Sequence, residues 1–149
     1  MVRAILLLAI PVLAVAGQPG VRTQFVGGTL AGVKAKADAR LDLTAPDTLH
    51  FQCGATDLRI DYKRVNTLEY GQNVSRRYAA AILVSPLLLL SKSRRHYVTL
   101  GYVDDAGSQQ AIVLRVEKGD IRTVLASLEA RTGRRVEYQD DEARKSGKG

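Results

Sequence analysis

Apolar residues recur with a short period along four stretches in the first half of the chain. These stretches are residues 39–43, 49–53, 58–62 and 65–70. Every second residue is apolar in the first three, and turn residues such as Gly, Pro and Asp separate the stretches. A period of two is typical of a strand with one buried and one exposed face. The four stretches therefore predict an antiparallel β-meander.

A sharp hairpin is predicted in the second half of the chain. Residues 96–102 and 109–116 each place three apolar side chains on one face. The segment between them contains Asp104-Asp105-Ala106-Gly107, which are residues that tolerate tight turns. This pattern adds two longer strands to the meander.

The last strong pattern has the period of a helix. Between residues 121 and 130, apolar residues fall at i, i+3, i+4 and i+7, on one face. Asp120 is the predicted N-cap, and Gly133 is the predicted C-cap. The apolar face consists of Ile121, Val124, Leu125 and Leu128.

The N-terminus has the three parts of a secretory signal peptide. Arg3 gives a positive start, residues 5–15 form an apolar run, and Ala14 and Ala16 form a small-x-small cleavage site. The run is shorter than the roughly 20 residues that span a bilayer. We therefore predict cleavage before Gly17 and an exported protein, periplasmic or extracellular.

Composition sets the remaining boundaries. We predict a signal peptide at 1–16, a flexible Gly-rich leader at 17–28, a folded domain at 29–138 and a disordered polar tail at 139–149. A domain of this size can form a core without disulfides. The single cysteine, Cys53, permits no intrachain disulfide and is predicted to be buried, because it alternates with apolar neighbours.

One segment does not fit the strand pattern. The apolar run from Tyr78 to Leu90 is broken only by Ser85 and Pro86, and cations flank both of its ends. As a helix it would be about 20 Å long, too short for a hydrocarbon core of roughly 30 Å, and Pro86 would break it. The candidate apolar contacts are Ile82, Leu83, Leu87, Leu88, Leu89 and Leu90, and the candidate headgroup contacts are Arg76, Arg77, Lys92, Arg94 and Arg95.

Three interpretations of this run remain open. It is buried in the core or against the helix, or it dips into a membrane while its cations meet anionic headgroups, or it docks a protein of the cell envelope. Four consecutive leucines, Leu87 to Leu90, are difficult to place in a strand with one buried face. Peripheral membrane association is therefore the leading prediction, and an envelope protein is the alternative partner.

The charge of the chain supports an anionic partner. The chain has 22 Lys and Arg against 15 Asp and Glu, a net charge of +7. A basic exported domain is drawn to anionic surfaces. Nucleic acid is not expected as the partner, because the chain has no Trp and two Phe, and its Tyr residues are not interleaved with the basic clusters.

No pattern in the chain points to catalysis. His50 and His96 have no clustered carboxylate that would complete a metal site, and His50 is predicted to be solvated. The pairs Asp104-Asp105 and Asp140-Asp141 fall in a predicted turn and in the predicted tail. Phosphate-binding Gly loops, nucleophile elbows and zinc motifs are absent from the sequence. We expect a binding module that is not an enzyme and uses no cofactor or metal.

The order of these elements resembles the pleckstrin-homology-like superfold, as seen in bacterial PH and GRAM-like domains. The likeness implies a mainly β fold with one C-terminal α-helix, in which the helix caps a bent β-sandwich or partly open barrel. The basic loop of the family between its first strands has no clear counterpart, since only Lys34 and Lys36 lie near that place. The phrases that carry the likeness are LRIDYKRV at 58–65, YVTLGY at 97–102 and the helix at 121–130, within roughly residues 29–138.

Overall fold

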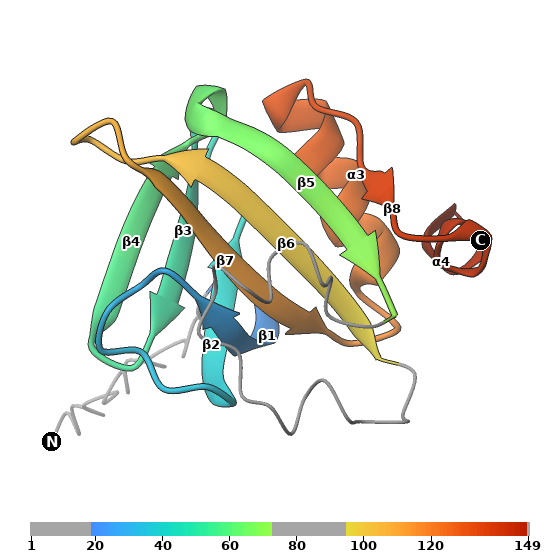
Figure 1. The fold of residues 1–149 in the computed structure, drawn as a ribbon, viewed down its shortest axis with the longest axis horizontal. Coiled ribbons are helices and arrows are strands. Elements are labelled where there is room, and N and C mark those ends of the chain that lie inside the picture. Colours follow the sequence, from blue (N-terminus) through green and yellow to red (C-terminus); the bar gives the residue numbers. More distant parts are fainter. Residues whose placement is uncertain (1–18, 73–94, 149) are drawn as a thin grey trace, which may run out of the picture.

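The computed structural model describes residues 19–72 and 95–148 (Figure 1). This part of the chain is mainly β, with one helix after the last long strand and a second at the C-terminus, which confirms the predicted fold class. The strands are β1 (Val21–Gly28), β2 (Ala37–Asp42), β3 (Thr48–Cys53), β4 (Thr56–Asp61), β5 (Val65–Gly71), β6 (His96–Val103), β7 (Gln109–Val116) and β8 (Glu137–Tyr138). The helices are the 3-10 helix η1 (Tyr62–Arg64), α3 (Ile121–Thr132) and α4 (Asp141–Lys148).

The strands form one curled sheet. Their order is β4-β3-β2-β1-β7-β6-β5-β8, and all neighbours are antiparallel except β5 and β8. The pairing of β1 with β7 joins the meander of β2, β3 and β4 to the later strands. The prediction that residues 65–70 continue this meander is wrong, because β5 pairs with β6 and β8 and not with β4. Figure 1 shows the sheet bent into a half-barrel, with α3 lying beside β5.

The alternation in the sequence fills the concave face of this half-barrel. In β3, for example, Leu49, Phe51 and Cys53 are buried, while His50 and Gln52 are only partly so. Full burial of a large apolar side chain stabilises the fold by roughly 1.5–3 kcal/mol. The predicted burial of Cys53 is confirmed.

Helix α3 closes the concave side with the apolar face that its sequence predicts. Ile121, Val124, Leu125 and Leu128 are all buried, and they join the same core cluster as the strands. Gly133 ends the helix in the left-handed conformation (φ 68°), and its N–H donates to the carbonyl oxygen of Glu129. Asp120 does occupy the N-cap position, but its side chain makes no capping hydrogen bond.

The predicted flexible leader is wrong in its described part, because residues 21–28 form β1 at the centre of the sheet. Thr23 lies opposite Ala39 of β2 on one side and Val116 of β7 on the other. Polar residues and paired glycines conceal this strand in the sequence, and half of its pairing comes from a strand far along the chain. A Cβ at Gly28 would lie 2.4 Å from the carbonyl oxygen of Ala111, so glycine permits this close pairing.

The predicted disordered tail at 139–149 is also wrong over its described residues. The N–H of Gln139 donates to the carbonyl oxygen of Tyr70 (3.1 Å), and its side-chain amide donates to Glu69 (3.2 Å). Asp140 then accepts a hydrogen bond from the N–H of Ala143 (2.6 Å), which satisfies a donor in the first turn of α4. Ala143 is fully buried. The helix is therefore anchored to the edge of the sheet formed by β5 and β8.

The central strands are buried on their outer face as well. Val26, Thr99 and Val113 are 0–3 % exposed, although their side chains point away from the concave core. Such strands carry no solvated face, which explains the near-continuous apolar runs of β6 and β7.

Candidate functional site

The candidate site lies where β5 ends and β6 begins. Gly71 is paired with Tyr97, so the chain leaves and re-enters the sheet at one point. An antiparallel pair needs only about two to five connecting residues, whereas residues 72–95 connect these two strands. The predicted apolar run is thus inserted between neighbouring strands. Its candidate residues Arg76, Arg77, Ile82, Leu83, Leu87, Leu88, Leu89, Leu90, Lys92 and Arg94 lie outside the described residues, and only Arg95 lies within them.

Two adjoining clefts open at this end of the half-barrel. The larger is about 860 Å³ and the smaller about 240 Å³, and both are lined by His96 and Lys118. The larger cleft also includes Gln72, Arg122, Lys145 and Ser146, and the smaller includes Arg95 and Arg115.

Five cations from separate segments meet around these clefts, and we call this region the basic end. Lys118 belongs to the turn after β7, in which the N–H groups of residues 120 and 121 both donate to the Glu117 carbonyl oxygen. Arg122 lies in the first turn of α3, and Lys145 lies on α4. The other two members are Arg95, just before β6, and Arg115 in β7.

Three of these cations have no compensating partner in the part of the chain that the structure describes. Among the described residues, Lys118, Arg122 and Lys145 make no hydrogen bond or ion pair with their side chains, and all three are exposed. Arg115 differs, because it pairs with Glu117 at 3.3 Å. The larger cleft therefore has a positive rim that the described residues do not neutralise.

His96 is held in a defined orientation at the wall of both clefts. Its Nδ1 lies 2.6 Å from the hydroxyl of the fully buried Tyr70, and the two rings stack at 5.9 Å. Burial raises the pKa of Tyr70, so its hydroxyl stays protonated and either donates to Nδ1 or accepts from it, according to the tautomer of His96. In both tautomers Nε2 is the ring nitrogen that this hydrogen bond does not use.

The environment also disfavours a charge on this ring. Burial, with the nearby Lys118 ammonium, lowers the pKa of His96, and Glu117 opposes this shift. His96 is therefore neutral at neutral pH in the described structure and offers one N–H donor.

Helix α4 is fixed tightly against this site. Gln72 donates to the Ser146 hydroxyl (2.6 Å), which donates to the Glu142 carbonyl oxygen (2.9 Å). A Cβ at Gly147 would lie 2.7 Å from the Tyr138 ring and 3.3 Å from the Tyr70 ring, so a glycine is needed for this approach. These contacts position Lys145 beside the larger cleft.

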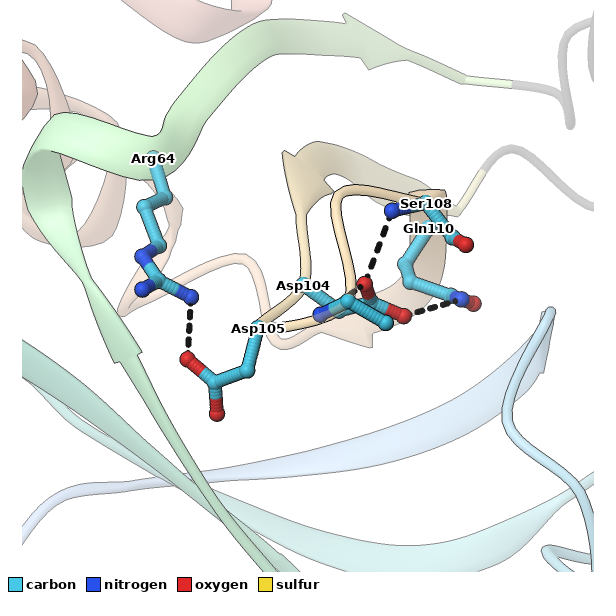
Figure 2. A network of polar contacts seen from close by, with 6 residues as sticks. Arg64, Asp104, Asp105, Ser108 and Gln110 are labelled. Carbon is cyan, nitrogen blue, oxygen red and sulfur yellow. Dashed lines mark hydrogen bonds and ion pairs between the residues drawn. The ribbon is translucent and has the colours of Figure 1, made fainter.

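A separate cleft of about 500 Å³ lies between β4, the loop after β1 and the β6–β7 turn. Figure 2 shows that three of its charged residues are engaged locally: Arg64 pairs with Asp105, and Asp104 accepts from the Ser108 N–H and the Gln110 amide (2.8 Å each). The bond from the Ser108 N–H, followed by that from Gln110, lowers the pKa of Asp104. The predicted role of Asp104 and Asp105 as turn residues is confirmed.

The remaining sequence candidates form no shared site. His50 was predicted to be solvated, but it is one-fifth exposed and lies 2.6 Å from Asp57. Lys34 and Lys36 are exposed in the loop after β1. Within residues 19–72 and 95–148, no three His, Cys, Asp or Glu side chains are grouped so that they could bind a metal.

Comparisons with known proteins do not assign the chain: no family model matches it, and no curated protein matches it. None of the helices in the described ranges is both long enough and apolar enough to cross a membrane.

Sequence analysis identified one described member of the site, Arg95, and missed the others. Lys118, Arg122 and Lys145 are isolated cations in the sequence, and only the fold brings them together. The Lys118-Gly119 pair directly before the helix was the one local signal of a basic turn at this end.

Proposed function

We propose that this protein is an exported, non-enzymatic module that associates peripherally with anionic membrane surfaces through its basic end. One observation carries the proposal. Cations from separate segments converge at the point where the sheet gives way to the apolar run between β5 and β6. An apolar element framed by cations is the arrangement that interfacial membrane binding requires.

The magnitudes favour reversible binding. Each Lys or Arg near an anionic surface contributes about 1 kcal/mol. Each leucine buried in the acyl region adds roughly 1.5–3 kcal/mol. The three unpaired cations Lys118, Arg122 and Lys145, together with the leucines of the run, are sufficient to hold a small domain on a bilayer.

The curled sheet and the closing helix α3 are compatible with the PH-like resemblance, which we retain as part of the proposal. Superfolds of this kind host many functions, so the proposal depends on the basic end and not on the fold.

The alternative function is docking of an envelope protein on the same run. In a third interpretation, the run is packed into the domain itself.

The first test changes the apolar run. We expect Leu88→Asp with Leu89→Asp to abolish flotation of the protein with anionic liposomes and to leave its circular dichroism unchanged, because charged side chains do not enter the acyl region. The matched control is Ala55→Asp with Ala106→Asp, which adds the same charge at two exposed turn positions away from the basic end.

Each other outcome contradicts the proposal in a different way. Unfolding of the leucine variant would show that the run is packed in the domain. A wild-type protein that is folded but never floats would leave the envelope partner as the better account. Normal flotation of the leucine variant would show that the run does not contact the membrane.

A further inference from the structure

We infer that the larger cleft of the basic end, lined by His96, Lys118, Arg122 and Lys145, is a binding site for a phosphate monoester group. The group belongs either to free phosphate or to a phosphorylated lipid headgroup, and in the second case the inference rests on the proposed function. General attraction to a charged surface requires only exposed cations. A cleft with donors converging from several elements suits a discrete anion.

The cations around the cleft match the charge of such a group. A phosphate monoester carries a charge of about −1.5 to −2 and three strong acceptor oxygens. Lys118, Arg122 and Lys145 come from a turn, α3 and α4, and the described structure gives their side chains no other partner. A guanidinium can also bind two phosphate oxygens at once.

His96 adds a ring nitrogen that the fold has oriented in advance. Its Nδ1 is engaged by the Tyr70 hydroxyl, so Nε2 remains for a ligand in either cleft that His96 lines, and it donates to an anion when it carries a proton. Burial lowers the pKa of His96, and the Lys118 ammonium lowers it further. A bound dianion would oppose both effects and raise that pKa.

The other charged groups around His96 do not supply such an anion. Tyr70 of β5 stays protonated, and the described contacts of Arg115 are with Glu117. Among the described residues, Glu117 is the one carboxylate whose charge acts on His96, and it does not prevent the lowering of the pKa. The cations that face the ring from other elements are Lys118, Arg122 and Lys145, with Arg95 at the start of its own strand.

The direct test is an NMR titration of the two histidines of the chain. We expect inorganic phosphate, compared with chloride at equal ionic strength, to raise the pKa of His96 by at least half a unit and to leave His50 unchanged. Lys118→Gln with Arg122→Gln should abolish the shift, because it removes two of the cations that line the cleft. Both side chains are exposed, so we expect the variant to fold. Lys34→Gln with Lys63→Gln is the matched control and should retain the shift. An unchanged His96, or an equal shift of His50, would overturn the site for free phosphate.

A vesicle experiment then distinguishes the two sources. Vesicles that contain phosphatidic acid, a monoester, are compared with phosphatidylglycerol vesicles, which carry a diester, at matched total negative charge. Tighter binding to phosphatidic acid, lost in Lys118→Gln with Arg122→Gln, assigns the site to a lipid headgroup. Equal binding to both lipids together with a silent His96 overturns this inference and leaves the proposed function intact. A phosphate-dependent shift of His96 without any vesicle binding supports the site and overturns the proposed function.

Discussion

The two ends of the half-barrel use charge in opposite ways. At the β6–β7 turn, Arg64 pairs with Asp105, and Asp104 is engaged by the Ser108 N–H and the Gln110 amide (Figure 2). At the basic end, the described contacts leave three cations without partners. Charges with local partners shape a turn, whereas unpaired charges gathered at a cleft are available to a ligand. The basic end is therefore the end whose charges are available to a ligand.

The substitution with the largest expected effect should unfold both ends of the half-barrel together. Helix α3 runs between them, and Leu125 at its middle is 3 % exposed. We expect Leu125→Asp to cost several kcal/mol, about 3–5, and to unfold the domain, because it buries an unpaired charge. Ala126→Asp places the same charge on the exposed face of the helix and should change the melting temperature by a few degrees at most. Equal melting of the two variants would show that α3 does not pack as described.

A smaller change should affect the basic end alone. Gly147→Val places side-chain atoms within 2.7 Å of the Tyr138 ring, which should displace α4 at a cost of about 1–3 kcal/mol. Hydrogen exchange should increase in residues 139–148 and remain unchanged in the β6–β7 turn. Increased exchange at the turn as well would contradict the independence of the two ends.

The sequence predicts the elements whose partners lie nearby in the chain. It misses the elements whose partners are distant in the chain. Alternation predicts β3 and β4, and the helical period predicts the buried face of α3. β1 was missed because its pairing with β7 is not visible in a local pattern. α4 was missed because Ala143 is the one fully buried side chain among its residues 141–147. The site was missed for the same reason, since Lys118, Arg122 and Lys145 are distant in the chain.

The β6–β7 turn should become less stable in acid. The pKa of Asp104 is lower in the folded protein than its ordinary value of 3.8, so its charge stabilises the turn above about pH 4, and this contribution is lost as the pH falls through the folded pKa. In melting curves from pH 6 to 3, Asp104→Asn should start less stable than the wild type and lose less stability on acidification. Parallel curves for the two proteins would show that Asp104 does not contribute in this way.

The central claim is that anionic membranes bind at the basic end. The most direct test makes the same change in net charge at the basic end and, in a second variant, away from it. Lys118→Glu with Arg122→Glu and Lys34→Glu with Lys63→Glu alter the net charge equally, and all four residues are exposed. With anionic vesicles at physiological salt, we predict that the first pair weakens binding at least tenfold, since each cation contributes about 1 kcal/mol, and that the second pair changes it less than threefold. Equal weakening by both pairs would show that only net charge matters, and this result would contradict a membrane site at the basic end.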